Sequence, residues 1–140
     1  MKEKIFIDTD VILDVALKRD EFGLFGALIF DNIEKGIFEG FTSSIIINNI
    51  YYIQRKIESR EKAINFIKKL IKLIKVLDVD EDVIKKALDS EMKDFEDSIQ
   101  NEVALKNNIE TIITRNTADY KKSKLKIYTS EEFVNIKIRK

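Results

Sequence analysis

The sequence contains no cysteine, no histidine and no proline, and only four of its 140 residues are glycine. Without cysteine the chain has no disulfide, no thiolate metal ligand and no thiol nucleophile. Without histidine it lacks the commonest general base and the commonest ligand of transition metals. Any chemistry must therefore rest on carboxylates, hydroxyls, lysine or arginine. A metal site built from oxygen atoms alone would favour Mg2+ or Mn2+ over zinc or copper.

Excess charge and long hydrophobic runs are also missing. The 25 basic and 25 acidic residues cancel, so any surface that attracts nucleic acid must be local. A hydrophobic fraction of 44% beside 36% charged residues is typical of a globular protein with a core. No apolar run approaches the roughly 20 residues that a membrane helix needs, and the start MKEKIFID is unlike a secretory signal. We expect a single domain over residues 1–140, a cytoplasmic location and no membrane contact.

Strand-like and helix-like segments alternate along the chain, which predicts an α/β protein. Helix caps are expected at Ser43 or Ser44, at Ser59, at Asp80 and in the box Thr129…Glu132. The run KVLDV at 75–79 is expected to be a buried parallel strand. We therefore predict a three-layer α/β/α fold with a central, mostly parallel sheet of four to five strands and a ligand site outside their carboxyl ends. Strands are expected at 4–8, 37–42, 75–79, 111–114 and 125–128, and helices at 10–18, 20–35, 60–73, 80–90, 94–107 and after residue 43.

Acidic residues stand where several of these apolar runs give way to a turn or a helix start. Asp8 ends the first predicted strand, and Asn116 and Asp119 follow the strand at 111–114. Asp94 and Asp97 lie three residues apart in the first turn of a predicted helix, so both can face the sheet edge. Carboxylates gathered this closely repel one another unless a divalent cation or a proton lies among them. The pattern predicts a carboxylate metal site.

Helix capping is the alternative explanation for most of these acids taken one at a time. An aspartate at a helix N-terminus accepts hydrogen bonds from free N–H groups and suits the helix dipole, which would account for Asp10, Asp94, Asp97 and Asp119. Asp8 is harder to explain in this way because it ends a buried strand. Asp14, one turn after Asp10, is expected either at the edge of the site or in a solvated or capping role.

Four segments, IFIDTDVILD, TSSIIINNIYYI, KDFEDSIQNEVALKNN and TIITRNTADYKKSKLKIYTSEEF, occur in an order that resembles PIN-domain proteins, similar to the VapC-type toxin ribonucleases. The resemblance implies a Mg2+- or Mn2+-dependent endoribonuclease that is the toxin of a toxin–antitoxin pair. It also implies a small antitoxin over the acidic groove and self-association through the helices around 43–74. The residues that it assigns are the catalytic, metal-binding acids Asp8, Asp97 and Asp119, the further metal-binding Asp94, and the supporting Thr9, Thr114 and Asn116.

One position departs from the family pattern. PIN nucleases usually carry an acid in the helix after the second strand, where this chain has Asn48 and Asn49. Asparagine offers a carbonyl oxygen but no charge, which should lower the affinity for a metal. The alternative reading is therefore a weakened or inactive PIN-like module that binds RNA or protein.

Two folds of other kinds also fit parts of the pattern. The stretch Asp8-Thr9-Asp10 after a strand resembles the nucleophile motif of haloacid-dehalogenase-like phosphatases, but no later acid pair of the expected kind follows. A receiver domain needs an acceptor aspartate at the end of a middle strand, and residues 40–57 contain none. We regard both as less favoured than a PIN domain.

In the nuclease reading, an ion held by Asp8 and Asp97 would activate a water molecule that Asp119 orients or deprotonates for in-line attack on a phosphodiester. RNA also requires nearby positive charge, for which Arg115, Lys121 and Lys122 are candidates, although a solvated lysine face explains them too. Further candidates are Lys124, Lys126, Arg55, Lys56 and Arg60, and for base stacking Tyr120, Tyr51 and Tyr52, with a core or interface role favoured for the last two.

Overall fold

The computed structural model describes residues 1–139, and five strands form one sheet in the order β3-β2-β1-β4-β5. All four neighbouring pairs are parallel. The strands are β1 (Glu3–Ile7), β2 (Phe38–Ser43), β3 (Lys75–Leu77), β4 (Thr111–Ile113) and β5 (Lys126–Tyr128).

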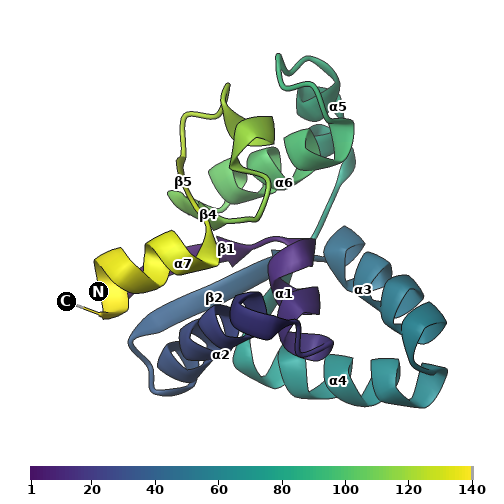
Figure 1. Cartoon of the computed structure of the whole chain (residues 1–140). Helices are drawn as coiled ribbons and strands as arrows, with labels where there is room; N and C mark the ends of the chain where they lie inside the picture. The colour runs from purple at the N-terminus through teal and green to yellow at the C-terminus, as the bar shows by residue number, and fades with distance from the viewer. Residues whose placement is uncertain (140) are drawn as a thin grey trace.

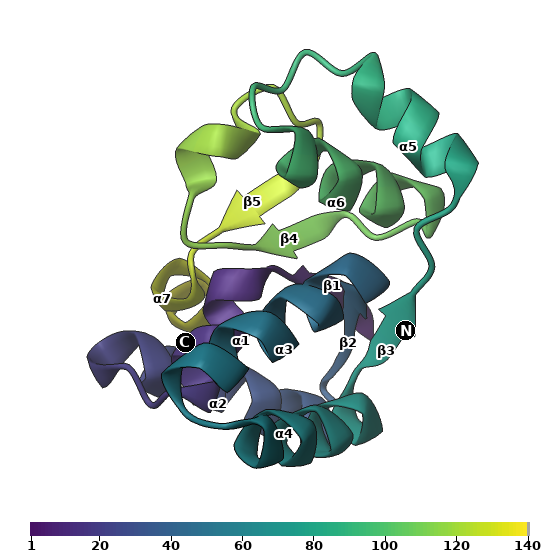
Figure 2. The same cartoon turned by 90° about the vertical axis from the view of Figure 1, so that its right-hand side faces the viewer.

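Helices cover both faces of this sheet, which confirms the predicted three-layer α/β/α fold. In Figures 1 and 2, α1 to α4 lie on one side of the strands, and α5 and α6 lie on the other. The helices are α1 (Thr9–Ala16), α2 (Asp20–Glu34), α3 (Ser44–Ile57), α4 (Arg60–Leu73), α5 (Glu81–Leu88), α6 (Phe95–Lys106) and α7 (Ser130–Phe133), with a short 3-10 turn η1 (Thr117–Tyr120) and a last turn η2 (Val134–Ile138). Within residues 1–139 we find no helix with the length and apolar character needed to cross a membrane.

The strand order explains where a site can form. The chain moves outward from β1 through β2 to β3, and then returns to the other side of β1 to add β4 and β5. Right-handed crossovers in opposite directions place their helices on opposite faces, so the helices diverge between β1 and β4. The carboxyl ends of β1 and β4 therefore open onto a crevice, as expected from the sequence.

The centre of the sheet is fully apolar. Ile5, Phe6 and Ile7 of β1 are all 0% exposed, as required of a strand that is covered on both faces. On β2, Gly40 allows close packing, because a Cβ atom there would come within 2.6 Å of Ile74 Cγ2 and 2.8 Å of Ile33 Cδ1. The core thus fixes the two central strands that lead toward the crevice.

Most predicted helix starts are confirmed. The side chains of Ser43, Ser59 and Asp80 each accept a hydrogen bond from the backbone N–H three residues later. Thr129 and Glu132 form the predicted capping box. These polar residues end their strands and loops because they satisfy N–H groups that a helix leaves free.

The prediction of a buried strand at 75–79 is wrong in two respects. The strand covers only Lys75–Leu77, and it lies at the edge of the sheet with Lys75 and Val76 exposed. A short apolar run is compatible with an edge strand as well as with a buried one. Here Lys75, the first residue of β3, pairs with Glu39 on β2 at 3.2 Å and belongs to the exposed rim of the sheet.

Candidate functional site

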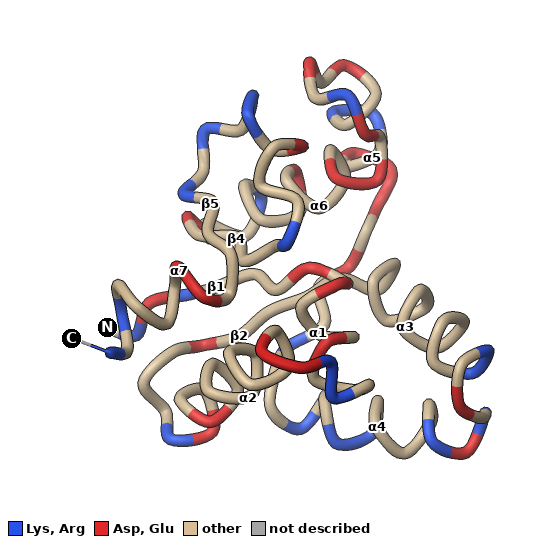
Figure 3. Tube along the Cα trace, in the orientation of Figure 1, with Lys and Arg blue, Asp and Glu red and all other residues tan. Residues whose placement is uncertain are grey.

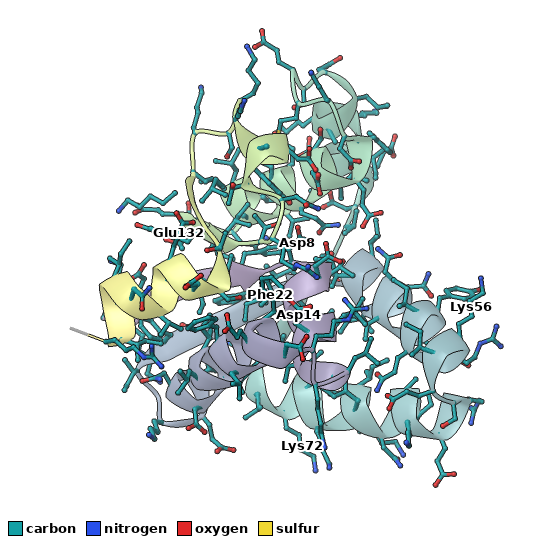
Figure 4. All side chains as sticks on the ribbon, in the orientation of Figure 1. Asp8, Asp14, Phe22, Lys56, Lys72 and Glu132 are labelled. Atoms are coloured by element: carbon teal, nitrogen blue, oxygen red, sulfur yellow. The ribbon has the colours of Figure 1, made fainter. Side chains whose placement is uncertain are left out.

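Asp8 lies directly after β1, at the crevice between the two helical layers, and only 8% of its surface is exposed. Figure 4 shows it near the middle of the molecule, where the upper and lower helices meet. Its Oδ1 accepts a hydrogen bond from the backbone N–H of Thr9 at 2.8 Å, and its Oδ2 accepts one from the Thr114 hydroxyl at 2.9 Å. Burial raises the pKa of Asp8, and these two hydrogen bonds counteract the rise.

Six carboxylates line a shared cavity of about 350 Å3 in front of Asp8. They come from three separate parts of the chain, as predicted: the end of β1, the start of α6 and η1. Within residues 1–139, no lysine or arginine lies within 4.0 Å of any of these carboxylates. The cavity therefore holds negative charge that the protein itself does not balance by close ion pairs. The lining residues are Asp8, Asp10, Asp94, Glu96, Asp97 and Asp119, with Thr9, Asn49, Ile53 and Asn116 between them.

Asp97 is one of the acids on which this concentration of charge acts. It is partly buried, and its pKa is raised from 3.8 to about 7, first by desolvation and then by the negative charges of Asp8, Asp94 and Asp119. At neutral pH a carboxyl group of this kind is only partly ionised in the absence of a cation. This result agrees with the expectation that a cation or a proton must offset the repulsion.

Asp94 combines the two roles that the sequence left open. It is the N-cap of α6, and its Oδ1 accepts a hydrogen bond from the backbone N–H of Asp97 at 2.9 Å. It also lines the acidic cavity. Asp119 is exposed in η1 on the opposite wall, and the side-chain amide of Asn116 reaches Asp10 at 3.5 Å. Capping and cavity formation are thus compatible at these positions.

The two predicted hydroxyl groups do not behave alike. Thr114 is buried and donates directly to Asp8, as expected. Thr9 contacts Asp8 only through its backbone, and its Oγ1 is buried without a partner among the described residues. A buried hydroxyl without a partner is costly, and this one belongs to a residue of the cavity wall.

Asn49 lies at the predicted place, on the α3 wall of the cavity, and it has a partner that the sequence did not suggest. Its side-chain amide donates to Glu96 Oε1 at 2.7 Å. Glu96 is exposed, yet partial desolvation and the charges of Asp8 and Asp94 raise its pKa. The sequence did not indicate a role in the site for Glu96, although this residue lies between Asp94 and Asp97 in the motif KDFED. An acidic residue at the second position of a helix is explained equally well by its favourable interaction with the helix N-terminus, so the sequence alone does not indicate a role in the site.

The prediction that Tyr120 stacks on RNA bases is wrong, because only 1% of its surface is exposed. Its hydroxyl instead lies between two acids of the cavity, 3.4 Å from Asp8 Oδ2 and 3.5 Å from Asp97 Oδ1. Burial, followed by the nearby charges, raises the pKa of Tyr120, so the hydroxyl stays protonated and donates. Tyr52 is 56% exposed and therefore is no core residue either.

Asp14 was expected at the site's edge or in solvent, and a solvated role is wrong. Its carboxylate is 1% exposed and pairs with Arg115 at 3.1 Å and with Arg19 at 3.4 Å. The guanidinium of Arg115 also lies 4.4 Å from the centre of the Phe22 ring. Arg115 and Phe22 line a cavity of about 480 Å3 that shares Asp10 and Asn116 with the acidic cavity, whereas Asp14 itself lines neither cavity.

The predicted RNA-binding residues divide into a near and a distant group. Lys121 and Lys122 line a third cavity, of about 400 Å3, together with Asp119. The loop that follows them is visible in blue above β5 in Figure 3. Lys56, by contrast, lies at the end of α3 that points away from Asp8 (Figure 4). Basic residues close to the acidic cavity therefore lie directly after β4, directly after η1 and, with Lys93, just before α6, and not on α3.

The donor set fits a hard cation, but its present arrangement does not hold one directly. Carboxylate and amide oxygens are the ligands that Mg2+ and Mn2+ prefer. In residues 1–139, no three histidine, cysteine, aspartate or glutamate side chains converge closely enough to hold a metal ion. Direct coordination by three of the acids would require their side chains to turn toward one another.

Comparison with known proteins gives a consistent picture. A family model described as PIN domain matches residues 4–118. Ribonuclease VapC1 of Aquifex aeolicus is 27% identical over 136 residues, which cover 94% of this chain and 93% of the relative.

Solved structures with the same fold are more distant in sequence. VapBC from Salmonella typhimurium, determined bound to DNA, matches with a TM-score of 0.69 and 16% identity over 91% of this chain and 98% of that chain. The sarcin-ricin-loop-cleaving toxin VapC20 of Mycobacterium tuberculosis matches with a TM-score of 0.68 and 14% identity over 87% of this chain and 98% of that chain. At these identities the likeness concerns the fold.

Proposed function

The chain belongs to the PIN-domain family, and from this membership and its acidic cavity we propose that it is a metal-dependent endoribonuclease of the VapC type. The observation that carries the proposal is the group of six carboxylates at the carboxyl end of β1, with no close cationic partner in residues 1–139. Such a group costs stability unless it serves to bind a cation. The alignment with Ribonuclease VapC1 extends over 94% of this chain, which supports RNA as the substrate.

Asp8, Asp97 and Asp119 are the residues proposed to hold Mg2+ or Mn2+, with Asp94 beside them. When bound, such an ion supplies positive charge for the reacting phosphate and acidifies a water molecule. Asp8 is held in one orientation by Thr9 and Thr114, so it is the fixed member of the set. Asp97 and the exposed Asp119 are less constrained and can turn toward it.

The chain has no histidine, so we assign proton transfer to a carboxylate of the acidic cavity. Asp119 is our candidate for orienting or deprotonating the attacking water, since it is exposed to solvent on the cavity wall. Asn116 contacts Asp10 and contributes a further amide at the rim.

RNA is proposed to approach across the wall that carries Arg115, Lys121 and Lys122, which adjoin the carboxylates together with Lys93. Phosphate contacts from them would offset the repulsion between RNA and the acids. The neighbouring VapBC structures are toxin–antitoxin complexes, which supports a small antitoxin as the partner of this chain. A homodimer through α3 and α4 remains part of the proposal.

The decisive experiment is cleavage of end-labelled structured RNAs by the purified protein in the presence of Mn2+, Mg2+ or EDTA. Asp97→Asn is the matched variant, because it removes one charge and keeps the shape of the side chain. We expect cleavage with either ion, none with EDTA, and none with the variant. Cleavage that persists in EDTA, or in the variant, would contradict the proposal.

A second function is favoured by one observation, the neutral Asn49 on the α3 wall. If the missing charge abolished catalysis, the chain would act as a PIN-like module that binds RNA or protein without cutting. In the same assay, Mn2+ binding and RNA binding without any cleavage would identify this alternative.

A further inference from the structure

Asn49 leaves α3 without a carboxylate at the acidic cavity, yet the charge at this wall is not lost. Glu96, in the first turn of α6, places Oε1 2.7 Å from the Asn49 amide nitrogen. Both residues line the cavity that contains Asp8 and Asp97. The carboxylate at the α3 wall thus comes from another helix, across the crevice.

The position of Glu96 is fixed by a buried contact one helical turn away. Gln100, four residues after Glu96 on α6, accepts a hydrogen bond through its Oε1 from the Ser43 hydroxyl at 2.6 Å. Both of these residues are 0% exposed, and Ser43 is the N-cap of α3. Residues four apart share one face of a helix, so the Ser43 contact sets the register that brings Glu96 to Asn49.

No lysine or arginine lies within 4.0 Å of the Glu96 carboxylate among the residues that the structure describes. The Asn49 amide is the one hydrogen-bond donor found for its carboxylate within residues 1–139. An amide donor orients a carboxylate without cancelling its charge, which leaves Oε2 free to face the cavity.

From this geometry we infer that Glu96 is a metal-binding residue of the acidic cavity and that Asn49 positions its carboxylate. The inference rests on the proposed function, because it assigns a ligand to the same site. It also removes the reason to regard Asn49 as a defect. The Asn49 amide donates a hydrogen bond to the Glu96 carboxylate, whereas a glutamate at position 49 would repel that carboxylate.

The test is calorimetric titration of Mn2+ into four forms of the full chain: the wild type, Glu96→Gln, Asn49→Ala and the double variant Asn49→Glu/Glu96→Gln. Glu96→Gln keeps an oxygen that accepts from Asn49 but removes the charge, and we expect it to weaken Mn2+ binding by about tenfold or more. Asn49→Ala should weaken it by about threefold, since the carboxylate stays but loses its orientation. The double variant moves the charge to α3 and should recover most of the affinity.

Glu102→Gln on the same helix is the control, because Glu102 does not line the cavity, and it should bind Mn2+ like the wild type. Circular dichroism of each form checks that it is folded. Equal Mn2+ affinity of the wild type and Glu96→Gln would overturn the inference, and so would a wild type that binds no Mn2+. RNA cleavage is measured separately. If Glu96→Gln weakens Mn2+ binding but the wild type cuts no RNA, the proposed function is contradicted and the assignment of Glu96 stands.

Discussion

The strongest prediction concerns Asp97→Asn, which should make the protein more stable while it abolishes cleavage. The pKa of Asp97 rises from 3.8 to about 7 on folding, and its causes are desolvation and neighbouring acids. At 1.36 kcal/mol per pKa unit, the difference between these values corresponds to at most roughly 4 kcal/mol. Because the side chain is only partly buried, solvent screens the repulsion, and we expect about 2 kcal/mol.

The sign of the pH dependence follows from which state binds more protons. Between the unfolded pKa of 3.8 and the folded pKa of about 7, the folded state keeps a proton that the unfolded state has lost. Stability of the wild type therefore falls as pH rises through this range and reaches its lowest level above it. Asparagine does not ionise, so the gain from the substitution should be full at about pH 8 and less than half of that at about pH 5.

The assay is urea unfolding of the wild type and Asp97→Asn at both pH values, in EDTA. Asp78→Asn, which removes an exposed acid outside the cavity, is the control and should shift the stability by less than about 0.5 kcal/mol. Addition of Mn2+ should stabilise the wild type more than the variant, because a ligand stabilises the state that binds it. If Asp97→Asn is no more stable than the wild type at about pH 8, the reasoning from charge repulsion is refuted.

Three further predictions follow from contacts near the site and in the core. Burial raises the pKa of Asp14 in spite of its two arginine partners, so Asp14→Asn, which removes the charge and keeps the shape, should leave the free energy of unfolding unchanged within about 1 kcal/mol or raise it in urea titrations. Gly40→Ala places a Cβ atom 2.6 Å from Ile74 Cγ2 and should cost about 2 kcal/mol in the same measurement. Lys121→Ala and Lys122→Ala should each weaken binding of a non-cleaved RNA and reduce the salt dependence by about one phosphate contact, whereas an unchanged dependence would exclude a direct contact.

The fold was predictable because its signals are local. Apolar runs, helical spacing and caps such as Ser59 and Asp80 act within a few residues, and they define the alternation of strands and helices. Once the alternation is known, the rules of parallel sheets bring the ends of β1 and β4 together. This is why Asp8 and the residues after β4 could be assigned to one cavity without coordinates.

The errors concern properties that depend on distant partners. Tyr120 looks like an exposed residue of a polar turn, and its burial results from the way η1 folds back against Asp8 and Asp97. Glu96 acquires its role from Asn49, which lies 47 residues earlier in the chain. A hydrogen bond of this separation leaves no periodic signal in the sequence, so only the folded structure reveals it.

Asp14 explains how the cavity keeps its negative charge although an arginine follows β4. Arg115 is close enough in sequence to Asn116 and Asp119 that it would neutralise the cavity if its side chain turned inward. Asp14 prevents this, because its buried carboxylate binds the guanidinium at 3.1 Å while Phe22 lies against it at 4.4 Å. Asp14 is buried whereas Asp119 is exposed, so solvent screens the pair of Arg115 with Asp14 less than it would screen a pair with Asp119. By binding Arg115 outside the cavity, Asp14 thus keeps Asp119 inside the cavity available for a cation.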